Sequence, residues 1–252
     1  MKPRGTDALL LAVGFLVCWQ VLYWLVGEDV VSAPSSTIAR AIALLRTQNF
    51  WHDAVSTGVA FAYACVIGIA GGVILGLLLG LNRFAGDVAD PILGTIYSIP
   101  KITLYPIILL IFGLSLAAKV AFGVIHGIFP VAIFTMNAVR NVAPVHRRTA
   151  KALRLTPFAT IVTVLAPAVV PEILSGVRIG IAVTLLGILI AELFASSSGI
   201  GFALIRATDV HNVVDIFALT LLLFLFAVAI NTLLHMGERR ARHGAEPDGR
   251  QS

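Results

Sequence analysis

Long apolar runs dominate this chain, and they constrain its fold more than any other feature. The charged fraction is only 12% of 252 residues, about half the usual fraction of a soluble domain. Helices need roughly 17–25 apolar residues to cross a bilayer. Six runs approach or exceed that length: Ala8–Val26, Thr57–Leu81, Ile102–Ala117, Val120–Val139, Ile173–Phe194 and Ile216–Leu234. We therefore predict an all-α membrane protein with about six transmembrane helices.

The first run, Ala8–Val26, could be a cleaved signal peptide or a retained helix, since both kinds of segment follow a short basic start. The run is 19 residues long, enough to span a bilayer, and no A-x-A-like cleavage site follows it. We expect a retained membrane helix.

A seventh apolar run, Phe158–Val170, has only 13 residues and is closed by Pro167 and Pro171. This length is too short for a spanning helix. We interpret it as an interfacial or packed segment, and we expect the next span to begin at Ile173.

The placement of cationic residues agrees with six spans. With a cytoplasmic N-terminus, thirteen Lys and Arg residues, Lys101 among them, fall in inside segments and four fall outside. This bias follows the positive-inside rule. A seventh span would place the basic C-terminal tail outside. The net charge of +5 therefore reflects topology and lipid headgroups rather than nucleic acid.

Between the first two spans, a helix start at Pro34 precedes apolar residues with helical spacing. The residues concerned are Ile38, Ala41, Ile42 and Leu45. We predict a short amphipathic helix on the outer surface, which lies on the membrane or contacts a partner.

The second run carries a small residue at every fourth position. The series is Ser56, Ala60, Ala64, Gly68, Gly72, Gly76 and Gly80. Shorter copies of the spacing occur at Gly123 and Gly127 and at Gly176 and Gly180. Small residues at this spacing let helix backbones approach closely in lipid. Two interpretations are open: ordinary close packing in a bundle, or a ridge that slides during transport.

Ionisable residues within the spans are few, namely Arg178, Glu192 and His126. Such residues are functional candidates, although the first two lie near span ends. A proton-driven pump would need a series of intramembrane carboxylates, which the runs lack. The sequence therefore favours a transport component over a stand-alone secondary transporter.

The sequence contains no catalytic or cofactor-binding motif. A phosphate-binding P-loop needs Gly-Lys followed by Ser or Thr, and no lysine here follows a glycine. Cys18 and Cys65 lie inside apolar runs, and no Cys/His spacing is typical of a metal site. We expect no enzyme activity and no cofactor, so any ATP hydrolysis must occur in another subunit. A membrane-embedded enzyme would need converging acids or a nucleophile with a base.

Several blocks, in this order, resemble the permease subunits of bacterial binding-protein-dependent ABC importers. The similar group includes the sulfonate, taurine, nitrate and thiamine-precursor permeases. The blocks are Asp90–Leu93, Ser98–Lys101, Leu104–Ile108, Ile111–Gly113, Leu165–Pro171, Gly176–Ile179, Ala191-Glu192 and Ser197–Gly201. Together the similarity covers about residues 30–236.

The resemblance implies a five-helix importer core plus one N-terminal helix. It also implies a pathway formed with a second permease copy, identical or different. The implied partners are ABC ATPase subunits and a periplasmic substrate-binding protein, and the implied substrate is a small anion or a thiamine precursor. Candidate pathway or packing residues are Pro100, Pro106, Gly113, Gly68, Gly72, Gly76, Glu192, Ser198, Gly199 and Gly201.

In this family, the loop before the fifth span docks into the ATPase with the pattern Glu-Ala-Ala, three residues, then Gly. Counting back from Pro167 places Arg148 at the glutamate, Ala150 at the second alanine and Arg154 at the glycine. Only Ala150 matches. The chain could pair with a different permease that carries the intact motif, meet an unusual ATPase surface, or be a divergent copy. The candidate coupling residues are Arg148, Ala150, Leu153, Arg154, Pro167 and Pro171.

These observations predict three regions. Residues 1–56 hold the first span and the amphipathic helix, residues 57–236 the importer domain with its coupling loop at 140–172, and residues 237–252 a basic cytoplasmic tail. The predicted protein is a multi-pass component of a bacterial inner membrane, with both termini in the cytoplasm. A secondary transporter coupled to an ion gradient is the alternative.

Overall fold

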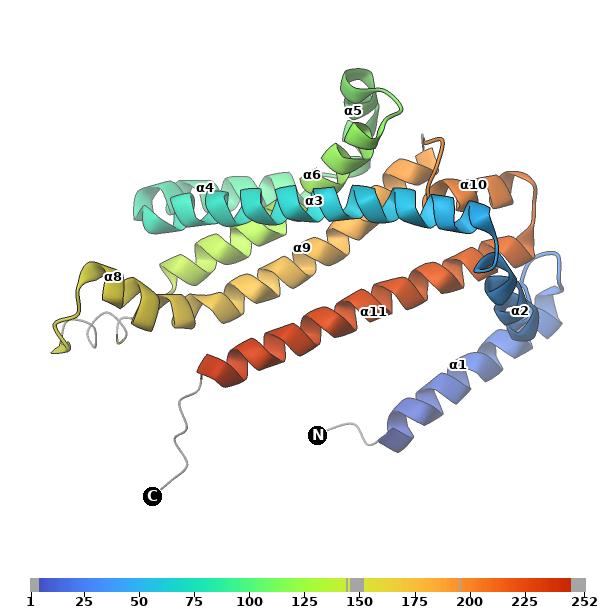
Figure 1. The fold of residues 1–252 in the computed structure, drawn as a ribbon, viewed down its shortest axis with the longest axis horizontal. Helices are drawn as coiled ribbons and strands as arrows, with labels where there is room; N and C mark the ends of the chain where they lie inside the picture. The colour runs from blue at the N-terminus through green and yellow to red at the C-terminus, as the bar shows by residue number, and fades with distance from the viewer. Residues whose placement is uncertain (1–4, 144, 146–151, 195, 246–252) are drawn as a thin grey trace. The chain divides into compact units, whose positions relative to one another are not determined.

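The computed structural model describes residues 5–143, 145, 152–194 and 196–245, and within these ranges every regular element is helical. The longest helices are α1 (Gly5–Val26), α3 (Gln48–Leu81), α6 (Leu116–Arg140), α9 (Ala166–Phe194) and α11 (Val213–Ala245). The shorter elements are α2 (Pro34–Leu44), α4 (Arg83–Ser98), η1 (Lys101–Leu104), α5 (Tyr105–Phe112), α8 (Pro157–Thr160), η2 (Ile161–Leu165) and α10 (Ile200–Asp209). Figure 1 shows these helices along the chain.

Five helices are long and apolar enough to cross a membrane, and a sixth span is present if a bent pair counts as one. Four of the five lie in α1, α3, α6 and α11, and the fifth, Val162–Phe194, runs from η2 through α9. The bent pair joins α4 to the segment Lys101–Phe112 at an angle of 82°. The prediction of about six spans in an all-α membrane protein is confirmed. The helix over Ala8–Val26 is present as predicted.

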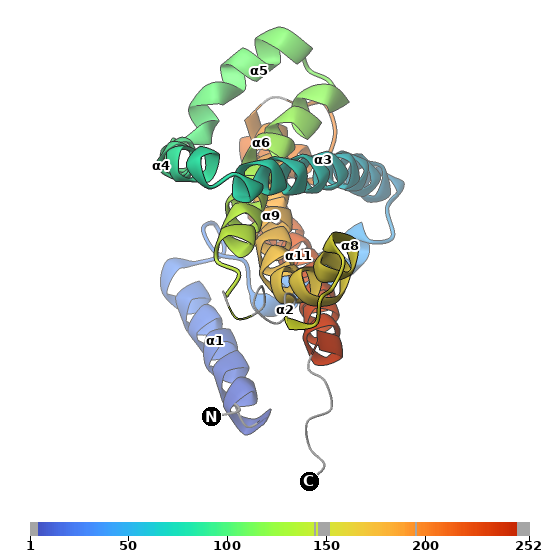
Figure 2. The ribbon, with the colours of Figure 1, turned by 90° about the vertical axis from the view of Figure 1, so that its left-hand side faces the viewer.

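The predicted third span, Ile102–Ala117, is wrong. Ile99 is extended, as expected for a residue before a proline, and Pro100 separates α4 from the short 3-10 turn η1. The α5 helix then ends at Gly113, whose φ of +64° suits glycine. The Ser115 side chain caps α6 by accepting a hydrogen bond from the Ala118 amide at 3.4 Å. The apolar run at this place is therefore divided between α4 and α5, with a sharp bend between them (Figure 2).

The run Phe158–Val170 is not a separate segment closed by prolines. The short helix α8 passes through the π-helical turn η2 into α9, which begins at Ala166 rather than at Ile173. Pro167 is the second residue of α9, so its missing backbone N–H falls where the π-helical turn η2 gives way to the α-helix. Pro171 lies inside α9, and the Ser175 hydroxyl donates to the Pro171 carbonyl at 3.0 Å. Neither proline ends the continuous helical run.

The structure divides into two compact units. The first comprises Met1–Thr57 and Glu192–Ala227, and the second comprises Gly58–Ala191 and Val228–Ser252. In the first unit, Ile200, Ala207 and Leu219 form a buried cluster. Its partly buried neighbours are Leu44, Phe50, Ala54, Ala203, Leu204, Ile216 and Leu223.

The predicted short helix before the second span is confirmed as α2. Thr37 and Ala41 are its buried residues, and Arg40 forms an ion pair with Asp215 at the start of α11. The hydrogen bond to Asp215 raises the pKa of the Arg40 guanidinium. Ile38 and Ile42 stay about half exposed, so the packed side of α2 is narrower than its apolar spacing predicts. Its place on the outer membrane surface stays a prediction.

Candidate functional site

The predicted glycine series of α3 lies against α6. A Cβ on Gly72 would lie 2.7 Å from the Val131 Cβ, and one on Gly76 would lie 2.6 Å from the Ala132 carbonyl oxygen. The Gly68 position is less tight, with its nearest α6 atom at 3.8 Å. The backbones of α3 and α6 can approach this closely only because side chains are absent. Close packing, one of the two interpretations of the series, is therefore present in this structure.

The other side of α6 packs equally closely on α9. Gly123 lies against the Ile188 side chain of α9, and a Cβ there would come within 2.7 Å of it. Gly127 of α6 and Gly180 of α9 face each other, because a Cβ on either would lie 3.1 Å from the other's carbonyl oxygen. Figure 1 shows α6 beside both α3 and α9. The three helices form a tightly packed group, which we call the α3–α6–α9 group.

Aromatic side chains extend this packing to α5. Tyr105 of α5 donates its hydroxyl to the Ala191 carbonyl at 2.7 Å, and its ring meets the fully buried Phe122 with centroids 4.9 Å apart. Ala191 is within the last four residues of α9, whose carbonyls have no partner in their own helix. The predicted candidate His126 lies next to Phe122, with Nδ1 2.9 Å from the Phe122 carbonyl oxygen. This hydrogen bond accounts for His126 as a buried packing residue.

Glu192 is fully buried and joins distant parts of the first unit. Its carboxylate accepts hydrogen bonds from the Thr57 hydroxyl at 2.9 and 3.0 Å and from the Gly201 amide at 3.0 Å. Thr57 in turn accepts from the Ile200 amide at 2.9 Å. The hydrogen bonds to Glu192 compensate for the loss of water around a buried carboxylate. We call this hydrogen-bonded set the Glu192 clamp; its members are Glu192, Thr57, Ile200, Gly201, Asp53, Ser56, Ser198 and Gly199.

The segment between α9 and α10 is held by the Glu192 clamp. Gly199 has a φ of +115°, and its amide donates to Asp53 Oδ1 at 2.8 Å. A Cβ on Gly199 would collide with the Glu192 carboxylate, so only glycine fits this position. The hydroxyls of Ser198 and Ser56 lie 2.8 Å apart. The predicted residues Glu192, Ser198, Gly199 and Gly201 thus come together.

Asp53 and Thr57 were not among the sequence candidates. They are four residues apart on α3, on one helix face, at the point where polar residues give way to the apolar run. This spacing places both side chains on one face of α3. It does not identify their partners, because these lie in the distant segment Glu192–Gly201.

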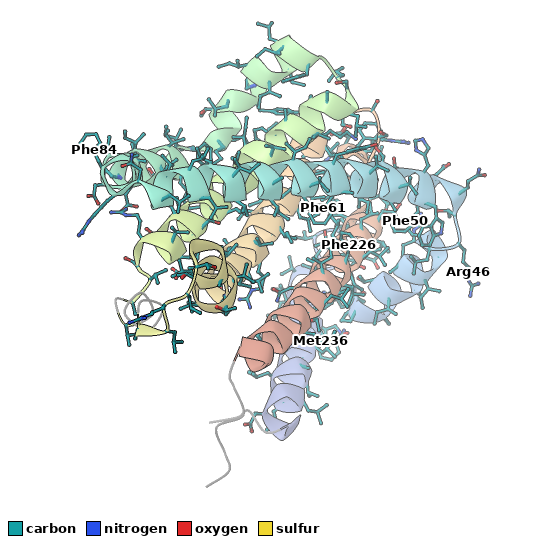
Figure 3. The ribbon with its side chains drawn as sticks, turned by 60° about the vertical axis from the view of Figure 1, so that its left-hand side comes forward. Arg46, Phe50, Phe61, Phe84, Phe226 and Met236 are labelled. Atoms are coloured by element: carbon teal, nitrogen blue, oxygen red, sulfur yellow. The ribbon has the colours of Figure 1, made fainter. Side chains whose placement is uncertain are left out.

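Pro100, Pro106 and Gly113 shape the bent α4–α5 segment. Pro100 lies at the bend, Pro106 occupies the first turn of α5, and Gly113 ends that helix. Most side chains along this segment are exposed; in α5 only Tyr105 and Ile108 are buried. An open apolar depression of about 280 Å³ on α4 is lined by Pro91, Ile92, Thr95 and Ile96. In Figure 3, Phe84 points outward from the start of α4, and the residue is 78% exposed.

The coupling candidates are only partly described. Arg148 and Ala150 lie outside the described residues. Leu153 is 64% exposed, and Arg154 has a φ of +50° in the left-handed region. Arg154 therefore adopts a backbone conformation that glycine favours; that this position corresponds to the glycine of the family pattern stays a prediction. Pro167 and Pro171 lie in α9, as described above.

Two arginines make further polar contacts in the second unit. Arg140, at the end of α6, pairs with Asp87 and Asp90 of α4 and donates to the Gly86 carbonyl at 3.2 Å. Arg178 of α9 lies 3.2 Å from Nδ1 of His235 in α11. Across the described residues, no group of three or more His, Cys, Asp or Glu side chains could hold a metal ion. The predicted site residues that the structure describes therefore lie in separate places, among them the α3–α6–α9 group, the bent α4–α5 segment and the Glu192 clamp. They do not form one reaction centre.

The helical membrane fold and its packed glycines define a polytopic membrane component. Residues 68–242 match the family model of binding-protein-dependent transport system inner membrane components. The chain is 30% identical to the nitrate import permease protein NrtB of Synechocystis over 215 residues, which cover 80% of this chain and 74% of NrtB. It is also 30% identical to the bicarbonate transport system permease protein CmpB of Synechococcus elongatus, over 83% of this chain and 81% of CmpB.

A solved structure has the same fold. A chain of the MetNI methionine ABC transporter, in an inward-facing conformation, superposes with a TM-score of 0.59 at 19% identity. The alignment covers 80% of this chain and 98% of that one. This chain belongs to the family of binding-protein-dependent transport system inner membrane components. The resemblance noted in the sequence is confirmed, and the chain is a multi-pass inner membrane transport component.

Proposed function

We propose that this chain works as one of two permease subunits that form a translocation pathway between them. The observation that supports this most is the exposed apolar surface of the bent α4–α5 segment, which contrasts with the closed α3–α6–α9 group. In α5, Leu110 is 88% exposed, whereas α6 is buried along much of its length. Apolar surface in a membrane faces lipid or another subunit. A second copy placed against α4 and α5 would enclose a pathway.

The proposed energy source is ATP hydrolysis in separate subunits. The turn at Arg154, with the exposed Leu153 beside it, lies in the loop where the family docks its ATPase. The left-handed conformation of Arg154 supports a docking turn of the usual shape, despite the missing glycine. Arg148 and Arg154 would then contact the ATPase surface, and a periplasmic binding protein would deliver the substrate.

The proposed substrate is a small anion. NrtB and CmpB are named for nitrate and bicarbonate, which are both small oxyanions. The proposed orientation has both termini in the cytoplasm. Lys101 lies within the bent segment rather than at its inside end, so twelve cationic residues remain inside against four outside. The positive-inside bias still supports this orientation.

The test is uptake by proteoliposomes that contain the chain together with its ATPase and binding protein. Candidate substrates are radiolabelled nitrate, bicarbonate and an alkanesulfonate. The proposal predicts uptake that requires ATP and the binding protein and that persists without an ion gradient. Uptake by the chain alone, driven by a sodium or proton gradient, would identify a secondary transporter instead.

Charge reversal tests the docking role separately. Arg148→Glu combined with Arg154→Glu should reduce copurification of the ATPase and the ATP hydrolysis that transport stimulates. Arg206→Glu, on α10, is the matched control and should leave copurification unchanged. Full association of the double variant would exclude these arginines as docking contacts.

A further inference from the structure

Lys101 occupies an unusual position for a lysine in a membrane protein. It is the first residue of η1, directly after Pro100, at the 82° bend of the broken α4–α5 segment. Its ammonium group lies 6.0 Å from the ring centroid of Phe129, which is near the middle of the 25-residue helix α6. Because α6 is long enough to span the bilayer, its middle marks the depth of the membrane centre. The charge of Lys101 therefore lies at the level of the middle of α6.

The Lys101 ammonium lies among aromatic rings. Its Nζ lies 4.4 Å from the Tyr97 ring centroid and donates to the Tyr97 carbonyl at 2.8 Å. An ammonium group has three donors, so this hydrogen bond leaves two for another ligand. Within the described part of the chain, no carboxylate lies within ion-pair distance of Lys101. The neighbouring Ile99, Ile102 and Leu104 are exposed, so the bend is not covered by the rest of its own unit.

A partly exposed lysine at this depth needs water or an anion, since facing hydrocarbon is costly. We propose that Lys101 lines the translocation pathway and binds small oxyanions at its centre. This inference rests on the proposed function and adds the residue that attracts the substrate. An isolated charge in an apolar setting attracts an anion more strongly than the same charge in bulk water does. A single ammonium site is also weak enough to release its ligand, as transport requires.

The experiment measures the charge preference of the pathway with thiol reagents and does not need the natural substrate. Cys18 and Cys65 are first replaced by Ala, and a single cysteine is introduced as Thr103→Cys or, in a second chain, Ser98→Cys. Both positions are exposed and lie close to Lys101 along the chain. The probes are an anionic reagent, methanethiosulfonate ethylsulfonate, and its cationic trimethylammonium counterpart. Each rate is measured on the assembled importer with Lys101 intact and with Lys101→Gln.

We expect both cysteines to react and the anionic reagent to be favoured. The ratio of anionic to cationic rates should fall about fivefold in Lys101→Gln, because a neighbouring charge acts oppositely on the two reagents. Lys101→Arg should keep the ratio, and a cysteine at the exposed position Thr208 of α10 (Thr208→Cys) should show no dependence on Lys101. A ratio that changes less than twofold in Lys101→Gln would overturn the proposal, as would failure of both cysteines to react.

A lipid headgroup is the other possible source of an anion for Lys101. The rates are therefore compared in phosphatidylcholine nanodiscs with and without phosphatidylglycerol. The proposal expects the same ratio in both, whereas a preference that disappears with anionic lipid would assign Lys101 to a headgroup and overturn the pathway role. ATP-driven uptake is measured on the same preparations with Lys101 intact. ATP-driven uptake without a preference for the anionic reagent would contradict only the role of Lys101. A preference for the anionic reagent without ATP-driven uptake would contradict only the importer proposal.

Discussion

The α3–α6–α9 group and the bent α4–α5 segment lie in the same compact unit but bury their side chains differently. In the first, glycines bring backbones together until a single methyl group would collide with a neighbouring helix. In the second, most large apolar side chains remain exposed, Leu110 and Ile111 among them. The first is complete within one chain. The second needs lipid or another subunit to cover it.

The largest expected effect comes from filling the closed packing. Gly76→Ala places a methyl group 2.6 Å from the Ala132 carbonyl oxygen, and a backbone atom in mid-helix cannot easily move away. Overpacking of this kind lowers the free energy of unfolding by about 2–3 kcal/mol. Equilibrium unfolding in mixed micelles measures the change.

Gly94→Ala is the matched control, because a Cβ on Gly94 of α4 meets nothing within 4 Å. It should raise the unfolding free energy by up to about 1 kcal/mol through helix propensity. If both variants lost the same free energy of unfolding, the α3–α6–α9 group and the bent α4–α5 segment would not differ in packing.

The Glu192 clamp is a second closed region, held by hydrogen bonds. We expect a slightly smaller loss of unfolding free energy when it is disrupted. Thr57→Val removes the hydroxyl that donates to both carboxylate oxygens of Glu192. A lost hydrogen bond to a buried charged group costs about 2 kcal/mol of unfolding free energy. Thr208→Val is the control and should change it by less than about 0.5 kcal/mol, because its hydroxyl bonds only within its own exposed helix turn. A clamp variant as stable as this control would show that Glu192 finds other donors.

The open segment should tolerate polar substitution in the single chain but not in the pair. Leu110→Ser is expected to change the unfolding free energy of the monomer by less than about 0.5 kcal/mol, since the side chain has little to lose. It should weaken association of two copies by about 1–2 kcal/mol, if the partner covers this residue. Dimer fraction against protein-to-detergent ratio measures the second effect. A monomer destabilised by several kcal/mol would mean that Leu110 is covered by its own chain.

The smallest expected effect is at the turn of the coupling loop. Arg154 has a φ of +50°, which a glycine adopts without steric cost. Glycine relieves the steric cost of the left-handed conformation but also gains conformational entropy in the unfolded chain. The net effect of Arg154→Gly should be a stabilisation of about 0.5 kcal/mol. The same change at Arg206, inside α10, should instead cost about 1 kcal/mol. Thermal unfolding measures whether each variant is more or less stable than the unchanged chain. Lower stability of both variants would argue against a left-handed turn at Arg154.

Much of the fold could be predicted from apolar run length alone, because every lipid-facing stretch must satisfy its own backbone hydrogen bonds. The errors fall at prolines. The sequence predicts that Pro167 and Pro171 close a short run, whereas the helix continues through both; the bend at Pro100 is not predicted. The effect of a proline depends on which carbonyl it would have paired with, and that is known only once the helix start is known.

The candidate site was predicted in part. The glycine series and the Ser197–Gly201 segment were visible in the sequence because their small residues recur at a fixed spacing or form a compact block. Asp53, Thr57 and Tyr105 were missed, because each acts through a partner far away in the sequence. The proposed role of Lys101 could not be predicted either, since it rests on the contact with Phe129, which is 28 residues away in the sequence.

The most direct test of the account is cross-linking between two copies of the chain. Single cysteines are placed at the exposed positions Ile102, Ile107 and Leu110 of the bent segment, in a chain without Cys18 and Cys65. The matched positions are Leu10 and Leu25, which are exposed on α1. The account predicts covalent dimers from one or more positions of the bent segment in assembled importers, with little from α1. Dimers from α1 alone, with none from the bent segment, would contradict a pathway formed between two α4–α5 segments.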